Sequence, residues 1–357
     1  MIEVHVFNSM LLPSLKATGW FGLLNFINGL VAPSFLFISG FAFMLSTQNI
    51  TKEMRRLKYP FWKKLGRILL IFLAGYSLHL PILSLRRIIN YYSPDVILRI
   101  YNVDILQCIA ASLLLIFIFR IIIKSEKLFT GYTVIMLLIS VFLAPLVWQT
   151  DFGRIFPVPL AAYFNNLYGS LFPLFPWMGF LFAGAIACNY FLSSKRTGSE
   201  ENYFKIILII GIFFVTAGSF LPAGILSFPA GIPRPHPLFF IERLGYVLIL
   251  LSACRYYVEF RSTKQSFVLD IGRESLLVYW LHLQILYRKF YNDNGLSDIF
   301  GQKLNLVECI LFTLVLAFLM VIVARYWGRL KKEYRSLISK LTLILVSALI
   351  LIFLIGF

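Results

Sequence analysis

The sequence predicts an all-α polytopic membrane protein with about ten complete transmembrane helices and a partial first helix. Hydrophobic residues make up 59% of its 357 residues, and the mean hydropathy is +0.82. A soluble protein of this length does not need so much apolar surface. Apolar runs near the ~20 residues that cross a bilayer recur along the whole chain. The lipid bilayer is therefore the first partner that the sequence implies.

Ten apolar runs have the length of a complete span, and a shorter helical fragment, 1–12, precedes them. Pro145, Pro173 and Pro176 fall near the ends of these runs, where a proline disturbs the fewest backbone hydrogen bonds. The expected spans are 29–46, 67–84, 103–123, 128–148, 172–193, 206–226, 239–257, 273–290, 304–325 and 339–357.

The distribution of Lys and Arg predicts the orientation of these spans. The formal charge of +17 would suggest nucleic acid as the partner of a soluble protein, but here the basic residues lie between the spans. The connection 47–67 holds seven Lys and Arg and one Glu, so we place it in the cytoplasm. Alternation from there puts 23 of the 33 Lys and Arg on the cytoplasmic face. No nucleic-acid partner is therefore expected.

The segment before the first complete span is unusually short. On the predicted orientation its helix runs outward, with His5 near the outer end, yet only four residues precede His5. Either this helix starts in mid-membrane, or the recorded start is short by roughly a dozen residues or more when measured against the ~20 residues of a span. We favour the second explanation.

The four cysteines, Cys108, Cys188, Cys254 and Cys309, all lie inside apolar runs, and none forms a CxxC pair. We interpret them as small core residues that imply neither a disulfide framework nor a metal site. The usual soluble-enzyme motifs, such as Walker A, HExxH and GxSxG, do not occur in the sequence.

Ionisable residues inside spans are costly and point to function. His5 has Asn8 and Ser9 on the same helix face, and an imidazole near the outer mouth of a cavity could act as a general base. A histidine bonded to a neighbouring helix at the membrane interface explains the pattern equally well. The sequence leaves both interpretations open.

Asp104 and Gln107 open the span NVDILQCIAASLL and face one way near the outer surface. The carboxylate could orient an imidazole or bind a polar substrate. It could also cap the helix, because Asp at a helix start accepts from free backbone N–H groups. These two roles do not exclude each other.

The stretch RPHPLFFIERLGYVL places His236 in a Pro-rich outer connection and Glu242 and Arg243 just inside the next span. Adjacent charges point to different sides of a helix, so each needs its own partner. A binding role is favoured for Glu242 and Arg243 over a structural ion pair, and neither reading is favoured for His236.

Ser275, Tyr279 and His282 form one polar stripe in GRESLLVYWLHLQ. From the stripe alone, hydrogen bonding between helices is the favoured interpretation, and a face toward a cavity is the alternative. His79 receives the same interpretation.

The basic cluster between Lys52 and Arg67 could bind a polyanionic cofactor from the cytosol. Orientation of the chain and attraction to anionic lipids are the favoured explanation when the cluster is taken alone.

Several stretches together resemble the heparan-α-glucosaminide N-acetyltransferase-like family of transmembrane acyltransferases. The resemblance runs in order over about residues 1–290 and implies one acyltransferase domain over 1–357, with 304–325 and 339–357 as additional C-terminal helices. It rests on VAPSFLFISGFAF, VDILQCIAASLLL, FPLFPWMGFLFAGA, LGYVLILLSACR and IGRESLLVYWLH.

Two features depart from the family pattern. Met1 and His5 match the Met-x-x-x-His end of the first helix of bacterial members, whereas the preceding Asp-x-x-Arg-Gly pattern is missing. The active-site histidine of the animal lysosomal members would fall near Gly19 and Trp20, where no histidine stands. If the chemistry is shared, His5 takes this role.

The resemblance implies transfer of an acetyl or other acyl group from cytoplasmic acyl-CoA to a sugar hydroxyl or amine outside, with no metal. His5 would be the general base, oriented by Asp104 or Glu242, and an acetyl-histidine intermediate is the other formal route. Candidate donors to the oxyanion or the sugar are Asn8, Asn28, Gln107 and Arg243. Further candidate substrate contacts are His236, Tyr279 and His282, and candidates for the CoA phosphates are Lys63, Lys64 and Arg67.

Two other function classes remain open. A transporter or flippase could use the same buried histidines and carboxylates, although no inverted repeat is visible. A degenerate family member could serve as a structural partner. The sequence leaves a homodimer open, and the lack of a domain before the first helix points to a bacterial plasma membrane.

Overall fold

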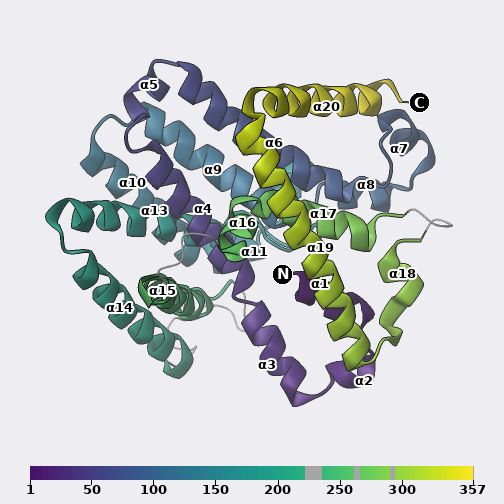
Figure 1. The fold of residues 1–357 in the computed structure, drawn as a ribbon, viewed down its shortest axis with the longest axis horizontal. Coiled ribbons are helices and arrows are strands. Elements are labelled where there is room, and N and C mark those ends of the chain that lie inside the picture. Colours follow the sequence, from purple (N-terminus) through teal and green to yellow (C-terminus); the bar gives the residue numbers. More distant parts are fainter. Residues whose placement is uncertain (222–234, 261–265, 290–293, 357) are drawn as a thin grey trace. The chain divides into compact units, whose positions relative to one another are not determined.

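A computed structural model of the chain describes residues 1–221, 235–260, 266–289 and 294–356 (Figure 1). Within these ranges the regular elements are helices, together with one isolated bridge between Leu11 and Leu304. The expected all-α class is therefore confirmed. The last residues of the expected spans 206–226, 273–290 and 339–357 lie outside the described residues.

The chain divides into two compact units. Unit 1 combines Met1–Gly29, Leu80–Ile97 and Thr263–Phe357, and unit 2 combines Leu30–His79 and Leu98–Ser262. Each unit is thus assembled from segments that are distant in the sequence.

Unit 1 holds the N-terminal and C-terminal helices. Its helices are α1 (Ile2–Met10), α2 (Pro13–Lys16), α3 (Gly19–Asn28), α7 (Leu85–Tyr91), α16 (Phe267–Arg273), α17 (Ser275–Tyr287), α18 (Leu296–Phe300), the 3-10 helix η3 (Gly301–Lys303), α19 (Leu306–Glu333) and α20 (Arg335–Ile355).

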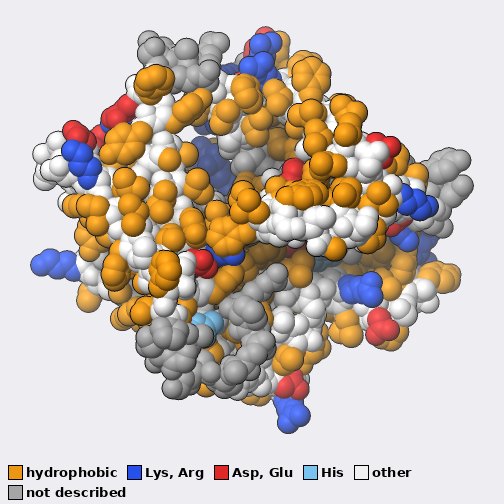
Figure 2. Space-filling view, turned by 90° about the horizontal axis from the view of Figure 1, so that it is seen from below, with side chains coloured by type: hydrophobic (Ala, Val, Ile, Leu, Met, Phe, Trp, Pro, Cys, Tyr) orange, Lys and Arg blue, Asp and Glu red, His pale blue; other side chains and the backbone are white. Residues whose placement is uncertain are grey.

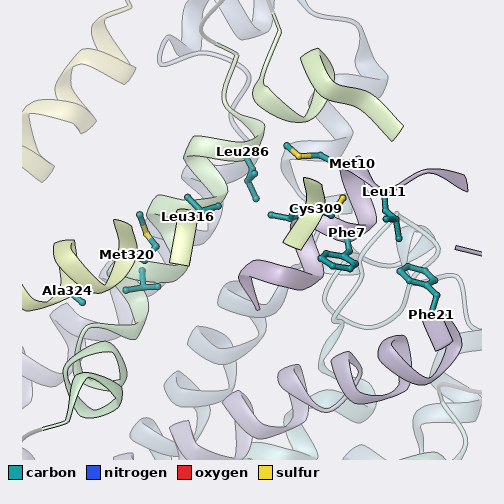
Figure 3. Packing of buried hydrophobic residues seen from close by; sticks show 11 residues of the cluster. Phe7, Met10, Leu11, Phe21, Leu286, Cys309, Leu316, Met320 and Ala324 are labelled. Carbon is teal, nitrogen blue, oxygen red and sulfur yellow. The ribbon is translucent and has the colours of Figure 1, made fainter. Parts of the chain in front are cut away.

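A hydrophobic cluster holds α1 inside unit 1, against α17 and α19 (Figure 3). Phe7 and Met10 of α1 meet Leu286 of α17 and Cys309 of α19 in this cluster. The backbone after α1 also pairs with the residue before α19, because Leu12 N donates to Leu304 O at 3.0 Å and Leu304 N donates to Met10 O at 2.9 Å. These contacts fix the helix that carries His5.

Unit 2 holds the middle of the chain. Its helices are α4 (Val31–Thr47), α5 (Thr51–Arg55), α6 (Tyr59–His79), α9 (Ile105–Ile122), α10 (Glu126–Phe142), α11 (Ala144–Gln149), the 3-10 helix η1 (Phe152–Arg154), α12 (Val158–Ala161), α13 (Leu174–Thr197), α14 (Glu200–Phe220) and α15 (Pro237–Phe260); α8 (Pro94–Ile100) runs across the boundary between the units.

Glycines bring several helices of unit 2 into backbone contact. A Cβ on Gly40 of α4 would overlap the carbonyl oxygen of Leu181 in α13, and one on Gly184 of α13 would overlap that of Phe37 in α4. Small residues at such positions let helices approach closely without an intervening side chain, as is common in membranes. The α4–α13 pair is therefore among the tightest contacts of the unit.

Seven helical segments of the described chain are long and apolar enough to cross a membrane: Gly19–Thr47, Ile105–Ile122, Leu174–Thr197, Glu200–Phe220, Pro237–Phe260, Leu306–Glu333 and Arg335–Ile355. Hydrophobic side chains cover much of the face in Figure 2, and α20 has no buried residue at all, as expected for contact with lipid. The chain is thus an integral membrane protein.

The other three expected spans also contain helices, but these helices are less apolar, interrupted or shorter than the seven above. In 67–84 the helix is α6, whose first half contains three basic residues. The run 128–148 divides at Leu143 into α10 and α11, with Pro145 in the first turn of α11. The run 273–290 contains α17, which has only 13 residues. Charge, proline and short length therefore separate these helices from the other seven.

The expectation that all four cysteines are core residues is wrong for one of them. Cys108, Cys188 and Cys309 are buried, whereas Cys254 is exposed on α15. Lipid accepts an apolar side chain as readily as a protein core does, so an apolar run alone does not distinguish the two environments.

Candidate functional site

His5 lies in the middle of α1, which buries Val6, Phe7 and Met10 in the core of unit 1. The imidazole is partly buried, and Ser9 Oγ donates to the His5 carbonyl oxygen at 2.6 Å. The hydrophobic cluster thus fixes the helix, while the ring of His5 contacts a different set of neighbours.

Three rings of α17 surround the imidazole of His5. Its centroid lies 5.4 Å from that of His282, 5.9 Å from that of Tyr287 and 6.3 Å from that of Tyr279. The Tyr287 hydroxyl is 3.4 Å from His5 Nδ1. Residues from the two ends of unit 1 therefore form one aromatic and imidazole cluster, hereafter the His5 cluster.

The polar stripe of α17 faces this cluster. Tyr279 and His282 are buried, and His282 Nδ1 lies 2.7 Å from the carbonyl oxygen of Val278 on its own helix. The structure shows ring contacts of Tyr279 and His282 with α1 and the bond of His282 within α17; hydrogen bonding between helices, the interpretation that the sequence favoured, stays a prediction. His282 and Tyr279 thus belong with His5.

Asn8 and Asn28 occupy other parts of unit 1. Asn8 is exposed, and its carbonyl oxygen accepts from Lys16 Nζ at 2.7 Å. Asn28, at the end of α3, donates from Nδ2 to Glu3 Oε1 at 3.4 Å. The predicted role of both residues, donation to a sugar or an oxyanion, stays a prediction.

Asp104 and Gln107 lie at the start of α9 in unit 2. Asp104 caps this helix, with Oδ1 accepting from Ile105 N at 2.8 Å, which confirms the predicted cap. Its other oxygen, Oδ2, is 3.8 Å from Nε2 of His79 at the end of α6. The carboxylate therefore faces the imidazole of His79, a specific pairing that no sequence pattern indicated.

Gln107 lies one turn below Asp104 and is completely buried. Its amide packs against Gly75 of α6, where an added Cβ would come within 2.8 Å of Oε1. The sequence favoured hydrogen bonding between helices for His79, and the structure makes it a further functional candidate beside Asp104. The available signal was that an outward span ends at His79 and an inward span begins at Asp104, so both ends meet the same membrane face.

Glu242 and Arg243 have separate environments on α15, as their adjacent positions predict. Glu242 Oε1 accepts from Ser219 Oγ of α14 at 3.2 Å, and the guanidinium of Arg243 lies over the ring of Phe239, 5.4 Å from its centroid. His236 Nδ1 accepts from Leu238 N at 3.2 Å and so supports the first turn of α15. These three residues occupy one end of α15 within unit 2.

The basic residues predicted to bind CoA phosphates lie in the first half of α6. Lys64 Nζ donates to Ser46 Oγ of α4 at 2.5 Å, and Lys63 Nζ is 5.7 Å from the centroid of Tyr59. Arg67 is exposed one turn beyond Lys63. Lys64 precedes the predicted span 67–84, and burial, together with the charges of Arg67 and Lys63, lowers its pKa to about 8.

The model of the family described as heparan-alpha-glucosaminide N-acetyltransferase, catalytic, matches residues 1–220. The chain belongs to this family. Neither a curated protein nor a solved structure matches it.

Membership in this acetyltransferase family makes the protein a membrane acyltransferase. The matched range includes His5, the basic residues of α6 and the Asp104–Gln107 turn, while residues 221–290 of the sequence resemblance, with Glu242 and His282, lie beyond it. In the part of the chain that the structure describes, no group of three His, Cys, Asp or Glu side chains could hold a metal ion.

The reaction class of the family requires three kinds of chemical group. Acyl transfer needs a base for the acceptor, donors for the developing oxyanion and cations for the phosphates of CoA. Within unit 1 an imidazole occurs in the His5 cluster, and within unit 2 an imidazole occurs beside Asp104, an amide at Gln107 and cations on α6.

Proposed function

We propose that this family member transfers an acetyl group from acetyl-CoA, which enters from the cytoplasm, to a hydroxyl or amine of a sugar on the extracytoplasmic side. The family match over residues 1–220 carries this proposal. The basic first half of α6 suits the anionic CoA, because Lys and Arg neutralise phosphate charge. A bacterial plasma membrane is the proposed location.

His5 is the proposed general base. Its imidazole takes the proton from the acceptor as the acceptor oxygen or nitrogen attacks the thioester carbonyl; the C–S bond then breaks, and the proton passes to the departing CoA thiolate. The ring packing of the His5 cluster supports this role, since a base must be held in one orientation to act efficiently.

Transfer of label tests the proposal directly. The full chain, reconstituted in lipid nanodiscs, is mixed with radiolabelled acetyl-CoA and glucosamine, in parallel with His5→Ala. We expect labelled product from the wild type and a loss of roughly 100-fold or more in the variant, the usual size of a general-base contribution. Ser9→Ala, one turn away on α1, is the matched control and should transfer at the wild-type rate.

The opposite result is equally clear. A well-folded wild-type protein that gives no labelled product with amino sugars and shows no heat of binding with acetyl-CoA does not carry out this reaction. Product formation that His5→Ala leaves unchanged removes His5 as the base while the acetyl transfer itself stands.

A further inference from the structure

The outer ends of α6 and α9 enclose polar atoms that have no hydrogen-bond partner in unit 2. Gln107 is completely buried, and neither Nε2 nor Oε1 of its amide makes a hydrogen bond. His79 Nδ1 is buried in the same way. Such groups are costly, and native proteins keep few of them unless they serve a ligand or a bound water.

Two residues of α6 and two residues of α9 lie next to these atoms. Gly75 and His79 lie one turn apart on α6, and Asp104 and Gln107 lie one turn apart on α9. Gly75 faces the Gln107 amide, and His79 faces the Asp104 carboxylate. The absence of a side chain at Gly75 is what leaves space for the amide between the helices, since a Cβ there would come within 2.8 Å of Gln107 Oε1.

Access to this interface comes from the His79 end. The side chains of His79 and Asp104 are 18% and 26% exposed, whereas Gln107 is fully covered. The cap bond from Ile105 N and the contact with His79 hold the carboxylate in place. A ligand would therefore meet a fixed imidazole first and the buried amide one helical turn deeper.

We propose that this α6–α9 end binds hydroxyl groups of the sugar acceptor through His79 and Gln107, with Asp104 as the residue that positions the imidazole. This proposal rests on the acetyl transfer proposed above. A sugar carries neighbouring hydroxyls that both donate and accept, which matches an amide with a free donor and a free acceptor beside a ring nitrogen. An acyl chain offers no such groups.

The test separates a sugar site from a structural contact between helices. The variants are His79→Phe and Gln107→Leu, which keep side-chain volume near its original value, and Gly75→Ala, which fills the space beside the amide. Ser112→Ala is the matched control, because it removes a buried hydroxyl from the same helix, α9, more than one turn away. Each full-length variant is measured in nanodiscs for KM and kcat with glucosamine and for thermal unfolding with and without glucosamine.

We expect His79→Phe and Gln107→Leu to raise the KM for glucosamine roughly fivefold to tenfold, the effect of losing one hydrogen bond, and to change kcat less than about twofold. Without sugar the midpoint of unfolding of Gln107→Leu should equal or exceed that of the wild type, because an unpaired buried group has been removed. Glucosamine should raise the unfolding temperature of the wild type and of Ser112→Ala only.

Two results overturn this inference. The first is acetyl transfer by the wild type with KM unchanged in both variants, which leaves the proposed function intact. The second is a lower unfolding temperature of Gln107→Leu without sugar, combined with no stabilisation of the wild type by glucosamine, which identifies a structural or water-filled contact. A third result separates the two proposals. If the wild type shows no transferase activity but glucosamine stabilises it, and His79→Phe and Gln107→Leu lose this stabilisation, the sugar site stands and the proposed reaction does not.

Discussion

The imidazole rings of His5 and His282 lie side by side, with their centroids 5.4 Å apart, although they belong to opposite ends of the sequence. His282 is completely buried, its Nδ1 is bonded to Val278 O, and its Nε2 is buried without a hydrogen bond. The ring thus forms part of the wall that holds His5. A buried ring in this position affects the stability of unit 1 through the volume that it fills as well as through its polarity.

Replacement of His282 separates these two contributions. His282→Ala removes the ring and leaves a cavity, which should lower the free energy of unfolding by about 2–4 kcal/mol. His282→Phe keeps a ring of similar size and removes the unpaired nitrogen, so its stability should stay within about 1 kcal/mol of the wild type. Thermal unfolding in detergent measures both variants, and an equal loss in the two would contradict the packing role.

Because α4 and α13 approach closely, we expect one added methyl group at their contact to lower the stability of unit 2 strongly. Gly40→Ala and Gly184→Ala each place a Cβ against a backbone carbonyl of the other helix, and backbone cannot move aside as a flexible side chain can. We expect each to destabilise unit 2 by about 1–3 kcal/mol or more.

Gly131→Ala is the control for these two substitutions. Gly131 lies inside α10 with no atom within 4 Å of the added Cβ. Alanine is the better helix former there, by roughly 0.5–1 kcal/mol, so this variant should be at least as stable as the wild type. Destabilisation of similar size at all three glycines would show that the helix contact is not the cause.

Prediction of the fold succeeded where the signal was local. Every expected span falls mainly on helix over its described residues, because hydropathy and length are properties of a continuous segment. The details that failed depend on single residues, such as the break between α10 and α11 beside Pro145. The exposure of Cys254 could not be predicted, since an apolar helix face suits lipid and protein equally.

The candidate sites were predicted residue by residue but not as groups. Asp104 was recognised as a cap, and His5, Tyr279 and His282 were each selected as polar residues in apolar helices. The contact between α1 and α17 joins segments at opposite ends of the sequence, and no local pattern encodes such a contact. Hydrogen bonding between helices was the favoured interpretation of His79, and its contact with Asp104 could not be predicted because the two residues lie on different spans. The catalytic role of His5 remains a prediction.

Asp104 has a capping role and a pairing role that two substitutions distinguish. Asp104→Asn keeps an oxygen that can accept from Ile105 N, whereas Asp104→Ala loses it. The alanine variant should therefore be less stable than the asparagine variant by about 1 kcal/mol, the usual value of an N-cap. Thermal unfolding compares the two, and identical midpoints would show that the cap contributes nothing to α9.

The lowered pKa of Lys64 predicts how binding of CoA depends on pH. Burial is the main cause and disfavours the charged form, and the neighbouring Arg67 and Lys63 add repulsion, so the pKa falls from its ordinary value to about 8. Only the charged ammonium attracts phosphate. If Lys64 contacts CoA, affinity should therefore be highest below this pKa and decrease as the pH rises from roughly 7 to 9.

Calorimetric titration with desulfo-CoA measures this effect without interference from the CoA thiol. Lys64→Arg should retain affinity across the whole interval, because a guanidinium stays protonated there. Lys64→Gln should bind more weakly at neutral pH and show little further loss on the alkaline side. If the wild type and Lys64→Gln lose affinity in parallel as the pH rises, the titrating group is another one and Lys64 does not contact the phosphates.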